Sequence, residues 1–314
     1  MTTVGGRQSN LELLRIVAMM FIIAHHCLIA SGAVDYYHPV IGPGNMFNAF
    51  LVCGVNCFVL ISGYFGIRLR APKLLRFCLL IAVTALFDVL LTLLPLDSQL
   101  FNLRYALHKI IPFFADSNWF IPSYIGLMLL SPLLNKALDA ATPRELGLWT
   151  LLLTLLNIYA YLFGVGAIDK AGYTLFQMAY LYVLGRYFRS VGHRVKASAA
   201  LAAYLLGAIA TALLTLVLGG GYSAFAYNSP QVLLASSGLF LLFRSFSFSS
   251  RIVNRVARSM FCVFLFHYLI IYNVRWSPYL TTAAAVFAAA FVGGFVIERA
   301  ASLIWGGVTR FRGA

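Results

Sequence analysis

The sequence predicts an all-α, polytopic membrane protein with about ten transmembrane helices and both termini in the cytoplasm. Composition is the first indication, because 61% of the residues are hydrophobic and only 10% are charged, against about 25% charged in a soluble domain. Long apolar runs succeed one another along all 314 residues, and each is close to the roughly 20 residues that a spanning helix needs. We therefore expect one transmembrane domain over residues 1–314, with no room for a soluble domain.

The apolar runs place the expected helices in order along the chain. The first run lacks a small-residue cleavage site and is followed by further runs, which indicates a retained helix. Between the third and fourth runs, residues 100–114 have a helical apolar period with basic side chains on the other face, typical of an interfacial helix. The spans are expected at residues 11–32, 46–66, 73–95, 118–137, 146–165, 172–188, 197–218, 230–247, 256–274 and 279–305.

Loop charges give the orientation. Of the 23 lysine and arginine residues, 18 lie in segments on the same side as the N-terminus and four lie in the opposite loops. Basic residues concentrate on the cytoplasmic side of membrane proteins, so both termini are expected there. The basic residues form short clusters between apolar runs rather than one continuous stripe, which argues against nucleic acid as a partner.

The cysteines predict neither a disulfide framework nor a metal site. They are odd in number and all lie inside apolar runs. Cys53 and Cys57 share a helix face, but no further His or Cys stands at metal-ligand spacing, so we interpret both as small packing residues. The five are Cys27, Cys53, Cys57, Cys78 and Cys262.

The first span, "LLRIVAMMFIIAHHCLIA", carries polar side chains inside an apolar run. Arg15 and His26 are eleven residues apart, nearly three helical turns, so they lie within about 20° on one face and roughly 16 Å apart along the axis. Glu12 lies one turn before Arg15 and can pair with it, whereas His25 points about 80° away. Either this stripe is a site, or Arg15 snorkels to the inner interface and the histidine is satisfied by a neighbouring helix.

Two further polar residues lie at membrane depth. Asp88 in the third span is at a depth similar to that of His26 and could orient its imidazole toward a role as a base. The alternative is a hydrogen bond from Asp88 to a core hydroxyl. His267 lies in the middle of "FCVFLFHYLIIY", where a hydrogen-bonded structural histidine is the simpler interpretation.

Basic residues also follow the second span, in "GVNCFVLISGYFGIRLRAPKLLRF". Arg68, Arg70, Lys73 and Arg76 fit the positive-inside rule, and they could also bind the phosphates of a cytoplasmic anion. Gly63 in the same stretch would let two helix backbones approach closely.

Four segments in order resemble one family. They are "NLELLRIVAMMFIIAHH", "CFVLISGYF", "WFIPSYIGLMLLSPLL" and "FCVFLFHYLI". Together with the spacing of Arg15 and His26, they resemble the membrane-bound acyltransferase-3 family, the integral-membrane O-acyltransferases of bacteria, over nearly the whole chain.

The resemblance implies an enzyme of the bacterial inner membrane. It would move an acyl group, usually acetyl, from cytoplasmic acyl-CoA to a hydroxyl of a surface or lipid-linked glycan such as an exopolysaccharide, capsule or O-antigen. Acyl-CoA would be a donor substrate rather than a bound cofactor, and membrane lipids would be the other partners.

The resemblance also carries roles to single residues. Arg15 and His26 match the essential pair, to which Asp88 is added as a catalytic candidate. Lys73 and Arg76 match the basic pair at the CoA end, and Arg68 and Arg70 are added there. The supporting candidates are Glu12, His25, Ser62, Tyr64, Trp119, Tyr124 and the late-motif histidine His267.

One departure concerns the stretch after Trp119. Many members carry a glutamate where this chain has Tyr124, which indicates the short branch without an appended hydrolase-like domain and weakens any role taken from that glutamate.

The residues fit this chemistry without the family. A polyanionic CoA belongs near the inner basic cluster, and its pantetheine arm is roughly as long as the 16 Å between Arg15 and His26. His26 would act as general base with a nearby donor for the oxyanion, or it would carry the acyl group itself.

Two rival functions remain open at this point. A flippase for a lipid-linked glycan would show a duplicated half-structure with broken helices in matching positions, and the sequence has neither. A glycan polymerase would carry a large outer loop rich in arginine, whereas the longest outer loop, 96–117, has two basic residues.

Overall fold

The computed structural model describes residues 8–35, 42–93, 119–166, 168, 170–217, 222–273 and 279–311. Within these ranges it does not describe the side chains of residues 88–93, 272–273, 279–281 and 306–311. The described residues form helices and connecting turns, with no strand among them. The all-α prediction is therefore confirmed.

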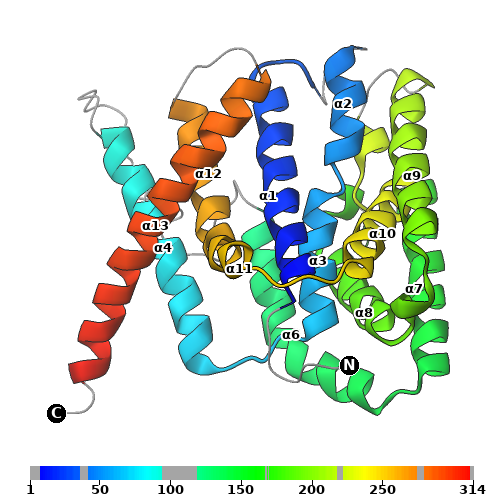
Figure 1. Ribbon diagram of the computed structural model, residues 1–314, viewed down its shortest axis with the longest axis horizontal. Helices are drawn as coiled ribbons and strands as arrows, with labels where there is room; N and C mark the ends of the chain where they lie inside the picture. The colour runs from blue at the N-terminus through cyan, green and yellow to red at the C-terminus, as the bar shows by residue number, and fades with distance from the viewer. Residues whose placement is uncertain are drawn as a thin grey trace.

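The long helices run up and down, with α2 and α3 following one another in the same direction and α11 lying across the bundle (Figure 1). α1 begins and α13 ends toward the same side of the molecule, and the assignment of that side to the cytoplasm rests on the loop charges. The helices are α1 Ser9–Ala30, α2 Pro43–Leu51, α3 Gly54–Phe65, α4 Ala71–Leu93, α6 Phe120–Ala140, α7 Pro143–Phe163, α8 Leu175–Val191, α9 Ala197–Val217, α10 Pro230–Ser245, α11 Arg251–Val256, α12 Met260–Asn273 and α13 Tyr279–Phe311. Short 3₁₀ turns are η1 Lys170–Gly172, η2 Gly192–Arg194, η3 Tyr222–Phe225 and η4 Ala257–Ser259.

Seven helical stretches of the described chain are long and apolar enough to cross a membrane. Each of the ten predicted spans coincides with helix, but α8 and α10 have only 17 and 16 residues, so the count of ten stays a prediction. Large apolar side chains on the outer face of α7, such as Leu151, Leu152 and Leu155, are more than half exposed. Such a face suits lipid rather than water.

Two predicted spans overlap stretches apolar enough to cross a membrane, but neither is one continuous helix. The expected helix 46–66 is interrupted at Val52 and Cys53, which separate α2 from α3. α3 begins at Gly54, where its backbone lies close to α1. A Cβ on Gly54 would lie 2.9 Å from the carbonyl oxygen of Ala18. The expected helix 256–274 is preceded by α11 and η4 and becomes the continuous helix α12 only at Met260.

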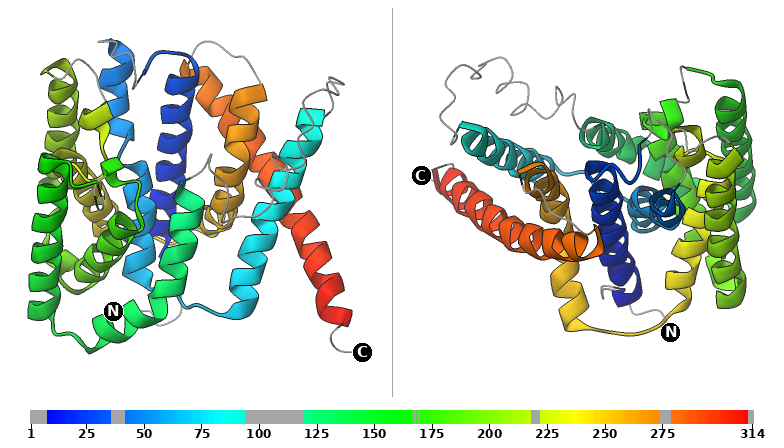
Figure 2. Two further views of the ribbon diagram at one scale, coloured as in Figure 1. Left: turned by 180° about the vertical axis from the view of Figure 1, so that it is seen from behind. Right: turned by 90° about the horizontal axis from the view of Figure 1, so that it is seen from above.

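α1 lies in the centre of the bundle. Seen from above in Figure 2, α4, α12 and α13 lie on one side of α1, and α3 and α7 to α10 lie on the other. α1 contacts α2, α3, α10, α12 and α13 directly. Most of the surface of α1 therefore meets protein, although Met20 is 47% exposed.

α3 and α8 approach closely through glycine. A Cβ on Gly63 would lie 2.2 Å from the carbonyl oxygen of Tyr182, and one on Gly185 would lie 2.3 Å from that of Leu60. Small residues at such crossings let backbones touch in membrane bundles. This contact is the one predicted for Gly63, and it holds the end of α3 against α8.

We expect Gly63→Ala to destabilise the protein by about 1–3 kcal/mol, because the added methyl must push the two backbones apart. Gly166→Ala is the matched control, since a Cβ there meets no atom within 4 Å. The measurement is thermal unfolding of the two purified variants in detergent. Equal melting temperatures would contradict the close approach.

Candidate active site

A cavity of about 370 Å³ lies between α1, α3, α4, α6, η4 and α12. Its lining changes from basic at one end to apolar at the other. The lining residues are Arg15, Ile22, Phe58, Ser62, Ile67, Lys73, Phe77, Phe120, Tyr124, Met128, Ala257, Arg258, Phe261 and Phe264. Three of these are basic and none is acidic, so the cavity attracts anions.

The basic end is built around Arg15. Its Nη1 donates to Glu12 Oε2 at 2.8 Å, as the spacing predicted, and the Glu12 side chain is only 7% exposed. The Arg15 side chain remains 27% exposed, and a guanidinium has five N–H donors, so it can contact a ligand in the cavity. Lys73 at the start of α4 and Arg258 in η4 add two exposed cations to this end.

A hydroxyl pair lies in the middle of the cavity. Ser62 Oγ donates to the carbonyl oxygen of Phe58 at 3.0 Å, and the Tyr124 hydroxyl lies 3.0 Å from the same Ser62 oxygen. Because serine has one hydrogen to donate, Tyr124 is the donor in the second bond. Tyr124 thus lines the cavity beside Ser62.

Aromatic rings form the walls toward the deep end. Phe77 stacks on Phe261 with 4.3 Å between ring centroids, and Phe120 lies 5.4 Å from Tyr124 and 4.9 Å from Phe264. Such walls accept an uncharged chain and exclude water.

Histidines lie directly beyond this end. His26 is one turn past Ile22 on α1, and His267 is three residues past Phe264 on α12. His26 Nδ1 lies 3.0 Å from His267 Nε2, and the Tyr268 hydroxyl lies 2.6 Å from His26 Nε2. We call His26, His267 and Tyr268 the histidine cluster. The cavity stops one turn short of it, at Ile22 and Phe264.

The adjacent histidine has a different environment. His25 Nδ1 lies 2.6 Å from Asn48 Oδ1 of α2, and the residue is only 4% exposed. Helix phase therefore separates the pair as expected, with His26 facing α12 and His25 facing α2.

The structure brings only some of the predicted donor-binding residues to the cavity. Lys73 lines it, whereas Arg68 and Arg70 are exposed and are not among its lining residues. Arg76 turns to α13, where its Nη2 donates to Ser302 Oγ at 3.2 Å and lies 4.0 Å from Glu298.

Two of the supporting candidates, Tyr64 and Trp119, pack elsewhere in the protein and are not among the cavity-lining residues. Tyr64 packs against Phe240, with 5.7 Å between centroids. Trp119 packs 4.6 Å from Tyr173, inside the protein. The Asp88 side chain and the predicted interfacial helix 100–114 lie outside the described residues.

Sequence reasoning missed Arg258, Tyr268 and Asn48. The sequence offers Arg258 only as one basic residue near the start of the predicted span 256–274. Tyr268 directly follows His267 in the quoted late motif, which was the available signal.

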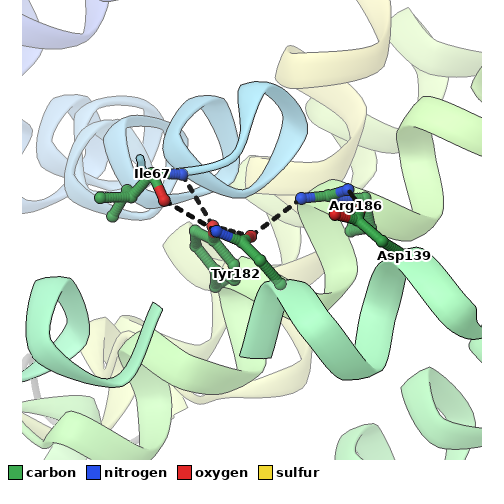
Figure 3. A network of polar contacts seen from close by, with 5 residues as sticks. Ile67, Asp139, Tyr182 and Arg186 are labelled. Atoms are coloured by element: carbon green, nitrogen blue, oxygen red, sulfur yellow. Dashed lines mark hydrogen bonds and ion pairs between the residues drawn. The ribbon is translucent and has the colours of Figure 1, made fainter. Parts of the chain in front are cut away.

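The chain between α3 and α4 is held by a polar network (Figure 3). The Ile67 N–H donates to the Tyr182 hydroxyl at 2.8 Å, and Asn135 Nδ2 donates to the Ile67 carbonyl at 2.7 Å. Tyr182 in turn donates to Asn135 Oδ1 at 2.6 Å. Arg186 donates to the same Asn135 oxygen at 3.0 Å and pairs with Asp139.

This network positions the start of α4. Gly66 precedes Ile67 with φ +78, a conformation that glycine adopts without strain. Ile67 lines the cavity, and six residues later Lys73 lines it too. The hydrogen bonds from α6 and α8 therefore fix the linker before α4 and, with it, the position of Lys73 at the basic end of the cavity.

The fold and cavity define a multi-pass helical membrane protein with an anion-attracting cavity that leads toward a histidine cluster. A family model described as "Acyltransferase domain" matches residues 8–299. The chain therefore belongs to the acyltransferase-3 family, as the motifs predicted, and is a membrane acyltransferase. No curated protein and no solved structure matches the chain.

We expect Tyr182→Phe to loosen the linker, because it removes the acceptor of the Ile67 N–H and the donor to Asn135. Losing a buried hydrogen bond costs about 1–3 kcal/mol. Trypsin should cleave after Arg68 or Arg70 faster than in the wild type. Tyr161→Phe, which loses only an exposed hydrogen bond to Ser223, is the control, and equal cleavage of both variants would argue against the network's role.

Proposed function

We propose that the protein is an acyl-CoA-dependent O-acyltransferase of the bacterial inner membrane. It would transfer an acyl group, acetyl by default, to a hydroxyl of a cell-surface or lipid-linked polysaccharide. The observation that carries the proposal is the polarity of the cavity, which has cations at one end, aromatic rings along its walls and His26 one turn beyond the other end.

Acyl-CoA, the proposed donor, fits a cavity that is basic at one end and apolar at the other. Its phosphates suit Arg15, Lys73 and Arg258, because charge-assisted bonds to phosphate are strong. Its pantetheine arm would follow the aromatic walls over the roughly 16 Å that separate Arg15 from His26 along α1. Ile22 and Phe264 line the deep end, so the thioester would have to pass these two side chains to reach His26.

The reaction requires a base and a stabilised oxyanion. In the direct route, His26 takes the proton of the acceptor hydroxyl while its oxygen attacks the thioester carbonyl. A hydrogen-bond donor beside that carbonyl would stabilise the tetrahedral oxyanion. In the second route, His26 itself accepts the acyl group and passes it on. Asp88, whose side chain lies outside the described residues, stays a catalytic candidate of the proposal.

The rival functions use no thioester. A flippase or a polymerase of a lipid-linked glycan would neither release CoA nor transfer an acyl group. Membership of an acyltransferase family supports the transferase, and release of free thiol from acetyl-CoA separates it from both rivals.

His26→Ala should lower acetyl transfer by about 10²–10⁴-fold, the usual contribution of a general base. The assay uses proteoliposomes with labelled acetyl-CoA and follows both acetylated glycan and free thiol. His193→Ala, which removes an exposed histidine of η2, should leave both signals unchanged. A wild-type protein that never releases CoA would refute the transferase.

Lys73→Ala and Arg258→Ala should each raise KM for acetyl-CoA about tenfold with little change in kcat, because each removes one charge-assisted contact with the donor. The measurement is a titration of acetyl-CoA in the same proteoliposomes. Arg251→Ala removes an exposed cation of α11 outside the cavity and should leave KM unchanged. Equal effects of all three variants would indicate a general surface charge rather than a binding site.

A further inference from the structure

One carbonyl group determines which nitrogen donates and which accepts in each hydrogen bond of the histidine cluster. His267 Nδ1 lies 2.5 Å from the carbonyl oxygen of Phe264. A carbonyl only accepts, so His267 Nδ1 carries the hydrogen. The residue is fully buried, which favours a neutral ring with a single N–H. Its Nε2 is then an acceptor.

The acceptor role of His267 Nε2 determines the protonation of His26. Its Nδ1 lies 3.0 Å from His267 Nε2, so His26 Nδ1 must be the donor. A neutral imidazole with its hydrogen on Nδ1 has its lone pair on Nε2. That lone pair receives the hydroxyl hydrogen of Tyr268 at 2.6 Å. His267 thus selects the tautomer of His26, and Nε2 is its basic atom.

Tyr268 therefore occupies the place from which a proton must arrive. Its ring packs 4.5 Å from the His26 ring. Tyr268 is half-buried, whereas His267 has no exposed surface. Because the Tyr268 oxygen already lies 2.6 Å from His26 Nε2, a hydroxyl that gives its proton to this nitrogen must either displace Tyr268 or pass the proton through it.

We propose that Tyr268 is a catalytic residue that relays the proton from the acceptor hydroxyl to His26. The proposal rests on the proposed function, in which His26 is the base. Tyr268 both donates and accepts through one oxygen, which is the property that a relay needs.

The step is balanced in atoms and charge. As the acceptor oxygen bonds to the thioester carbonyl carbon, its proton moves to the Tyr268 oxygen, and the Tyr268 proton moves to His26 Nε2. The carbon–sulfur bond then breaks, and CoA leaves as a thiolate. The proton returns from His26 through Tyr268 to the sulfur, which restores both residues and needs no other reactant.

The test is Tyr268→Phe in proteoliposomes with acetyl-CoA and the glycan acceptor. This change keeps the ring packing and removes only the hydroxyl. The relay predicts that kcat falls about 100-fold or more, with KM for acetyl-CoA unchanged. Tyr204→Phe is the matched control, because it removes a tyrosine hydroxyl that donates to the Phe50 carbonyl away from the cluster, and it should retain full kcat.

A Tyr268→Phe variant that keeps kcat within about threefold of the wild type, or transfers faster, overturns the relay, since general acid–base steps contribute far more than that. If that result comes with an inactive His26→Ala, the proposed function stands and only the relay fails. If His26→Ala is active as well, the proposed base has failed together with the relay.

A second variant protects the test against misfolding. Replacing Tyr268 by 3,5-difluorotyrosine keeps the ring and the hydroxyl but makes the hydroxyl more acidic. A relay then changes kcat by at least about threefold, because proton-transfer rates follow acidity. A kcat equal to that of the wild type would mean that the hydroxyl only packs, and would overturn the proposal.

Discussion

The polar groups of α1 constrain the rest of the structure, because a buried polar group in a membrane must find its partner inside the protein. Asn10 donates to the Phe243 carbonyl at the end of α10, at 3.1 Å. His25 reaches Asn48 of α2, and His26 reaches α12. These bonds direct three neighbouring helices to defined faces of α1 and explain its central place in the bundle.

The cavity follows from the same constraint. Arg15 and Glu12 satisfy each other near the start of α1, which keeps a cation at the cavity without leaving a buried charge unpaired. Further along α1 the lining becomes apolar, at Ile22, and no polar partner is required until His26. α1 thus contributes a residue to both the basic and the apolar end of the cavity.

The linker between α3 and α4 completes the basic end by a different means. Glycine lets α3 and α8 touch, and this contact brings Tyr182 and Arg186 of α8 to the linker. Tyr182 and Asn135 of α6 bond to the backbone groups of Ile67, so these bonds position the chain without dictating its side chains. The position of Lys73 depends on this arrangement rather than on a bond of its own.

Local features of the site were predictable from the sequence. Helical period alone placed Arg15 and His26 on one face and His25 on another, and the Glu12–Arg15 pair is a contact within one turn. Apolar run lengths predicted where helix forms, although not the break at Val52, because that break depends on how closely the chain meets α1.

Only the tertiary structure decided which remote residues join the site. Arg258 and Tyr268 stand more than 240 residues after Arg15 and His26 respectively, and their approach depends on how η4 and α12 pack against α1. Arg76 carries the same charge as Lys73, yet it turns to α13. Periodicity determines the direction of a side chain within its own helix, whereas the partner it meets depends on the packing of all the helices together.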